Sequence, residues 1–204
     1  MNKTKDIFIK KGIVKNKPAK ALEIFSQICP DFTIYQANKS SETINILWQK
    51  YLNLGKFDNS INGKVFEYIL SAILINKKLL PFYTQAKIAF VPNADYDLLF
   101  YCKEKGPIAL SAKTSLRERY KQADLEAVAL KYVYRKSESY LITMDKNETK
   151  NIQDKVKNGE VIGINKVIYA LNNEFNELLD YLQNKHNFIE AGKIDIITHG
   201  NIIK

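Results

Sequence analysis

The chain of 204 residues carries 31 Lys and Arg residues against 22 Asp and Glu residues, which gives a formal net charge of +9. Its hydrophobic fraction of 46% excludes general disorder, no apolar run reaches the roughly 18 residues of a membrane span, and the N-terminus lacks the apolar core of a signal peptide. We therefore expect one soluble, cytoplasmic domain over residues 1–204. The positive charge favours a polyanionic partner, most simply a nucleic acid, although an AT-rich genome also enriches lysine and asparagine.

The basic N-terminal segment, residues 1–20, carries seven lysines and one acid. It is expected to be a solvated, partly frayed terminus, with a short strand or an arm laid on phosphates as the alternatives. Cys29 and Cys102 lack the spacing of metal ligands and are interpreted as reduced, buried thiols. His186 and His199 stand late in the chain and receive no role.

Two helices are predicted between a short helix that Pro30 ends and the first strand. One begins at Ser40 and ends at Gly55, and the other is capped by Asn62 and runs over residues 63–76. The second leaves few polar faces, so it should be central and buried. It contains Glu67, which is either a metal ligand or supporting acid, or a residue of the exposed edge.

Segments rich in β-formers then alternate with helical segments. Gly106-Pro107 marks a hairpin turn. Strands are expected at residues 86–91, 96–102, 108–113, 140–144, 161–170 and 194–198, and helices at 114–134, 146–157 and 172–185. The economical fold is α/β, with a central mixed β-sheet flanked by helices.

The hairpin is the first candidate for chemistry. Asp97 opens one strand and Lys113 ends the next, so the hairpin can bring the carboxylate to the ammonium. Mg²⁺ would use Asp97 and a strand carbonyl, at Ser111 or Ala112, and keep positions for water and phosphate. Lys113 would deprotonate or orient the attacking water of a phosphodiester hydrolase. The spacing alone equally describes an ordinary cross-strand ion pair.

The following helix adds a third charged candidate. Its apolar stripe places Glu126 roughly 80° from the stripe's centre, at the boundary between helix and sheet. From there a carboxylate can reach over the sheet edge toward Lys113. The alternative is a half-exposed acid paired with Arg119, and the geometry does not separate the two.

The start of that helix carries Arg117, Glu118 and Arg119. Arginine can bind guanine O6 and N7 in a bidentate manner, and glutamate can accept from cytosine N4, so the triplet could read a GC-rich half-site. A charged first turn is otherwise ordinary solvated surface.

Together these residues resemble the PD-(D/E)XK nuclease superfamily, and within it the type II restriction endonucleases related to the EcoRII catalytic domain, PspGI and NgoMIV. Most of the superfamily has an acid two positions before the lysine, where this chain has Ser111. This branch supplies that acid from the following helix, and Glu126 lies 13 positions after Lys113, where it is expected. The resemblance covers roughly residues 62–134.

The resemblance implies roles for single residues. Asp97 is the metal-binding acid, with Asp95 as a less favoured alternative, and Lys113 is the catalytic lysine. Glu126 is the relocated acid and metal ligand. Glu67 matches the acid often found on the helix before the hairpin. The triplet Arg117, Glu118 and Arg119 matches the residues with which this branch reads a CC:GG half-site.

The resemblance also implies a Mg²⁺-dependent enzyme that cuts double-stranded DNA at a palindrome containing CC and GG, on the 5′ side of CC. A palindrome implies a homodimer, for which the helix at 172–185 and the final strand are candidate contacts. A companion DNA methyltransferase follows from the family. The rivals are a structure-specific repair nuclease or resolvase, a catalytically dead DNA-binding module, and an RNA-binding protein.

Overall fold

The computed structural model describes residues 2–14, 19–192 and 197–204. Its centre is a six-stranded sheet in the order β5-β4-β3-β2-β1-β6. The strands are β1 Phe82–Ile88, β2 Tyr96–Cys102, β3 Gly106–Lys113, β4 Glu138–Thr143, β5 Lys166–Tyr169 and β6 Ile197–Ile203. The strands β6, β1, β2 and β3 pair antiparallel in that order, whereas β4 and β5 continue the sheet in parallel pairing. The predicted mixed α/β sheet is confirmed.

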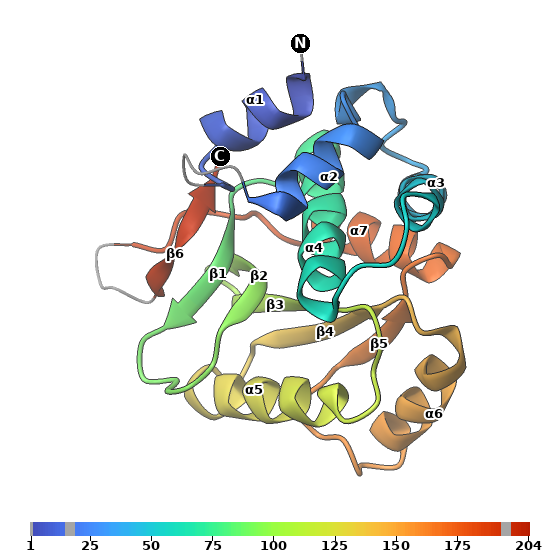
Figure 1. Ribbon diagram of the computed structural model, residues 1–204. Helices are drawn as coiled ribbons and strands as arrows, with labels where there is room; N and C mark the ends of the chain where they lie inside the picture. The colour runs from blue at the N-terminus through green and yellow to red at the C-terminus, as the bar shows by residue number, and fades with distance from the viewer. Residues whose placement is uncertain (1, 15–18, 193–196) are drawn as a thin grey trace.

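Helices cover both faces of the sheet (Figure 1). They are α1 Lys3–Lys10, α2 Lys20–Ile28, α3 Ser40–Asn53, α4 Asn59–Asn76, α5 Arg119–Val133, α6 Lys146–Lys157 and α7 Asn173–Lys185, with a short 3₁₀ turn, η1 Phe32–Ile34. The largest core packs α1 to α4 and α7 against one face, and two smaller cores pack α5 and α6 against the other. Within the described residues no helix is both long and apolar enough to cross a membrane.

The helix α4 forms the centre of the larger core, as its sequence predicts. Nine of its residues are buried, from Val65 to Leu74. Its start differs from the prediction, because the cap is Asp58, whose carboxylate accepts a hydrogen bond from the Ile61 amide at 2.9 Å. The helix therefore begins one turn earlier, and Asn62 lies inside it, where its side chain bonds the Tyr51 hydroxyl. Both residue types cap helices well, so the sequence offered two possible starts.

The N-terminal segment contradicts the prediction of a frayed terminus. Residues 3–10 form α1, capped by Asn2, whose side chain accepts from the Lys5 amide at 3.0 Å. Phe8 is fully buried and packs on the rings of Phe25, Phe32 and Tyr68. Because the segment is rich in lysine, its sequence did not indicate that Phe8 would anchor a helix. Residues 15–18 lie outside the described residues.

Other element ends shift as well. The strand expected at residues 86–91 is β1, which begins at Phe82, and that expected at 161–170 shortens to β5. The final strand runs to Ile203, and residues 194–196 of the expected run lie outside the described residues. Both cysteines are free and buried, as expected.

Candidate active site

Asp97 and Lys113 meet at the ends of their strands. The Asp97 Oδ2 atom accepts hydrogen bonds from the Lys113 Nζ atom at 3.0 Å and from the Ala112 amide at 2.9 Å. The two side chains are 13% and 16% exposed, so the pair is largely removed from water. The ion pair that the sequence left open is therefore present. A buried pair of this kind contributes little net stability, which leaves open a role beyond packing.

Asp95 lies two residues before Asp97 in a different environment. Its side chain is 60% exposed and lies 3.7 Å from the Lys87 ammonium. Asp95 precedes the first residue of β2 and is a surface acid, whereas Asp97 lies within the strand and is largely buried. Of the two acids, only Asp97 contacts Lys113, which is the placement that the sequence analysis favours.

Glu67 projects from α4 into the same neighbourhood. Its Oε2 atom accepts from the Lys64 Nζ atom at 2.7 Å and from the Gln85 Nε2 atom at 3.0 Å. Burial, and then the negative charge of Asp97, raise the pKa of Glu67, while the ammonium groups of Lys64 and Lys113 oppose that rise. Because its side chain is only 16% exposed, Glu67 does not lie on the exposed edge.

Glu126 enters from α5 and is 8% exposed, so the alternative of a half-exposed acid is wrong. Its carboxylate accepts from the Gln122 side chain at 2.8 Å, one helical turn away, rather than from Arg119. Burial raises the pKa of Glu126, and the nearby charges of Asp97 and Asp95 add to this, while Lys113 opposes it. Glu126 and Ser111 line one small cavity between α5 and the sheet. The helix thus brings a carboxylate next to the serine that stands two positions before Lys113.

Three largely buried carboxylates, from α4, β2 and α5, therefore lie within electrostatic reach of one lysine, and Asp97 contacts it directly. The Asp97 charge disfavours ionisation of both Glu67 and Glu126, which shows that the acids repel one another. A divalent cation would relieve that repulsion, and carboxylate oxygens are the ligands that Mg²⁺ prefers. Within the described residues, however, no three acid, histidine or cysteine side chains gather closely enough to hold an ion by themselves. The residues fit a cation that keeps water or substrate oxygens in its shell.

The side chains of Arg117, Glu118 and Arg119 are exposed. Only Arg119 belongs to α5, so the expected helical start at Thr114 is wrong. Arg117 adopts a positive φ of 31°, and its amide donates to the Glu148 carboxylate of α6. Leu116, fully buried next to it, anchors the turn.

Three contacts of this site were not predicted from the sequence. Lys64 precedes Glu67 by one helical turn, and that spacing could have revealed the ion pair. The contact between Gln85 and Glu67 could not have been predicted, because the sequence of a strand does not indicate that one of its polar side chains reaches a particular helix. Glu148 also escaped notice, since its partner is a backbone amide 31 positions away.

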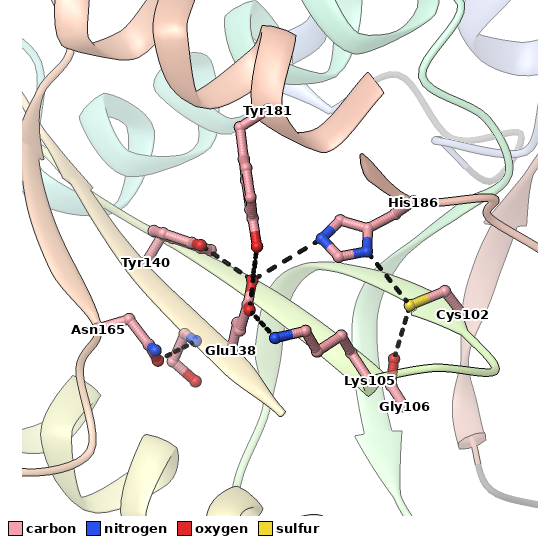
Figure 2. Close-up of polar contacts among 9 residues, drawn as sticks. Cys102, Lys105, Gly106, Glu138, Tyr140, Asn165, Tyr181 and His186 are labelled. Atoms are coloured by element: carbon pink, nitrogen blue, oxygen red, sulfur yellow. Dashed lines mark hydrogen bonds and ion pairs between the residues drawn. The ribbon is translucent and has the colours of Figure 1, made fainter. Parts of the chain in front are cut away.

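A separate buried carboxylate, Glu138, lies on the face covered by α7 (Figure 2). Glu138 accepts from Lys105 at 2.7 Å, from the Tyr140 hydroxyl at 2.9 Å and from the Tyr181 hydroxyl at 3.2 Å. His186 Nε2 lies 4.0 Å from this carboxylate, and His186 Nδ1 lies 3.8 Å from the Cys102 sulfur.

Cys102, His186 and Glu138 follow one another in space like the residues of a nucleophilic triad, but they lack the exposure and reactivity that such a triad needs. Cys102 is fully buried, and burial raises the pKa of its thiol, so neither substrate access nor thiolate formation is favoured. Burial likewise lowers the pKa of His186. This cluster ties β4 to the β2–β3 turn and to α7 and the segment after it.

The comparisons with known proteins bear on the fold. No protein-family model matches the chain, and no curated protein matches its sequence. Among solved structures, the chain is similar to the one titled "Restriction endonuclease PspGI-substrate DNA complex", with a TM-score of 0.57 and 14% sequence identity. The similarity covers 87% of this chain and 85% of that chain. The chain therefore has the restriction-endonuclease-like fold that its sequence predicts.

Proposed function

We propose that the protein is a Mg²⁺-dependent type II restriction endonuclease that cleaves double-stranded DNA. One observation carries this proposal: Asp97, Lys113, Glu67 and Glu126 converge from four different elements of a restriction-endonuclease-like fold. Largely buried carboxylates whose pKa values are raised, next to a lysine, are typical of catalytic sites. DNA is the substrate named for the structural neighbour, and the net charge of +9 suits it.

Each residue has a distinct task in this proposal. Lys113 orients the attacking water and stabilises the negative charge that develops on the phosphate. Asp97, Glu126 and the carbonyl of Ser111 or Ala112 would hold the metal ion, with Glu67 supporting them. When bound, Mg²⁺ would supply positive charge beside the phosphate and lower the pKa of a bound water. Asp97 also holds the Lys113 ammonium in place at 3.0 Å.

Site recognition falls to Arg117, Glu118 and Arg119. We propose that these exposed side chains read a palindrome containing CC and GG, such as CCGG, CCNGG or CCWGG, and that cleavage occurs 5′ of CC. The contact between the Arg117 amide and Glu148 fixes the turn that presents them. A palindromic target calls for a homodimer with one half-site per subunit, and a companion methyltransferase would protect the host's own sites.

The test is a digest of unmethylated phage DNA with purified protein and Mg²⁺, followed by sequencing of the fragment ends. Discrete fragments whose ends begin at CC would support the proposal in full. Random nicking, or cutting governed by DNA structure, would contradict site recognition and favour a repair nuclease or resolvase.

A second candidate is a DNA-binding module without catalysis. The observation in its favour is that, within the described part of the chain, no three metal-ligating side chains cluster, while Lys113 already pairs with Asp97. This candidate predicts sequence-specific binding that survives Lys113→Ala, with no cleavage in Mg²⁺ or Mn²⁺. A gel-shift assay beside the digest separates the two functions.

A further inference from the structure

The strand β1 contains a bulge at Gln85. Thr84 pairs with Asn201 of β6, but the next pair is Lys87 with His199, so two residues of β1 stand against one of β6. Gln85 has a φ of 51°, in the left-handed region that a glutamine rarely adopts. Strained residues in bulges are concentrated near functional sites, where they redirect a side chain.

The bulge reverses the alternation of side chains along β1. Phe82 belongs to the core under α4, whereas Tyr83, Ala86 and Ile88 belong to the core under α5. In a regular strand Gln85 would point with Tyr83, away from α4. Because Ala86 takes the α5 face instead, the side chain of Gln85 turns toward α4, where its Nε2 atom meets Glu67 at 3.0 Å.

The neighbouring strand accommodates this geometry with a glycine. A Cβ atom on Gly200 of β6 would lie 3.1 Å from the Ala86 Cα atom and 3.3 Å from the Thr84 carbonyl oxygen. Gly200 also has a φ of 147°, which strongly favours glycine. Two separate strands thus share the deformation that directs one amide to one carboxylate.

We propose that Gln85 is a positioning residue of the nuclease site, which holds the Glu67 carboxylate toward Asp97 and Lys113. This inference rests on the proposed function. Lys64 and Gln85 donate to the same Glu67 oxygen. The Gln85 amide therefore restrains the orientation of the carboxylate without adding charge. A neutral donor restrains the carboxylate while leaving its negative charge available to a cation.

The variant Gln85→Asn separates this role from packing. Asparagine tolerates a positive φ better than glutamine, but its amide is one methylene shorter and cannot make the contact with Glu67. We expect kcat to fall about 10-fold or more with KM for DNA unchanged, as for other residues that orient ligating side chains. In a Glu67→Ala background the same change should have no further effect on kcat.

Thermal melts of the same four proteins provide a readout that needs no cleavage. Relief of strain raises Tm, whereas loss of the contact lowers it, so Gln85→Asn should raise Tm more in the Glu67→Ala background than in the wild type. The matched control is Lys78→Asn, at a φ of 59° outside the site, which should raise Tm equally in both backgrounds and leave kcat unchanged.

The outcomes are distinct. An active wild type with Gln85→Asn at full rate, or with equal losses in both backgrounds, would overturn the positioning role alone. Equal Tm changes for Gln85→Asn in the two backgrounds would also overturn it, because the contact with Glu67 would then carry no energy. A wild type that cuts no DNA in Mg²⁺ or Mn²⁺ would overturn the proposed nuclease function and, with it, the positioning role.

Discussion

Two buried carboxylate clusters lie toward opposite ends of β3, one beside Lys113 and the other beside Lys105, and they differ in how their charge is balanced. Burial alone would raise the pKa of Glu138, but hydrogen bonds from Lys105, Tyr140 and Tyr181 lower it below its ordinary value. At the other cluster burial wins, and the pKa values of Glu67 and Glu126 rise, in each case with the charge of Asp97 adding to the rise.

The difference indicates which cluster serves the fold and which serves chemistry. Glu138 has enough donors to satisfy its charge, so its cluster is complete as it stands. Glu67 pairs with Lys64 and Asp97 pairs with Lys113, yet burial keeps the pKa values of Glu67 and Glu126 raised despite these ammonium groups. In the proposed nuclease, a metal ion would supply the additional positive charge that completes this site.

The largest expected effect belongs to Lys113. Lys113→Ala should reduce the rate of DNA cleavage by about 10²- to 10⁴-fold, because the lysine acts on the attacking water and the developing charge. Specific binding should remain largely intact, since the ammonium lies beside Asp97 rather than among the exposed recognition residues. Single-turnover cleavage and gel shifts measure the two effects.

The control for Lys113→Ala is Lys157→Ala, which removes an exposed lysine of α6. It should cut DNA at the wild-type rate. Loss of specific binding in Lys113→Ala would reassign the lysine from catalysis to DNA contact.

Disrupting the charge-balanced cluster around Glu138 should reduce stability rather than catalysis. Glu138→Ala leaves the Tyr140 and Tyr181 hydroxyls without their acceptor and should lower the free energy of unfolding by about 2–3 kcal/mol. Lys105 is 37% exposed and can turn to water, which limits the loss. Urea denaturation gives the value, with Glu160→Ala, at an exposed position, as the control. A change as small as that of the control would show that Glu138 does not clamp the fold.

The pH dependence should differ in sign between the clusters, with effects on the order of 1 kcal/mol. The native pKa of Glu126 lies above its ordinary value of 4.5, so wild-type stability declines as pH rises from 4.5 through that pKa. Glu126→Gln escapes this decline and should become relatively more stable toward neutral pH.

For Glu138, whose native pKa lies below 4.5, the stabilisation is complete above pH 4.5 and is lost as pH falls through the native pKa. Glu138→Gln should therefore show its full deficit at neutral pH and a smaller one in acid. Thermal melts in EDTA from about pH 4 to about pH 7 test both variants. Parallel curves for the two variants would contradict the contrast between the clusters.

The sequence predicted the central residues of this site better than the residues that position them. Asp97 and Lys113 could be placed because a hairpin fixes which strand ends meet, although the turn lies at residues 103–105 and the predicted turn residues Gly106 and Pro107 begin β3. The helical spacing of apolar residues places Glu126 at the boundary between helix and sheet, but its burial depends on how α5 packs against the sheet. Gln85 could not be assigned, because its direction depends on a bulge stabilised by Gly200, over 100 positions away. The helix α1 was missed because one buried phenylalanine outweighs its lysines.

A Mg²⁺ titration of the cleavage rate for the wild type and Glu126→Gln tests the central claim most directly, namely that the repelling acids are completed by a metal ion. If Glu126 helps to hold the ion, the half-saturating Mg²⁺ concentration should rise about 10-fold or more in the variant. Identical titration curves would contradict the claim and make Glu126 a buried acid of the fold.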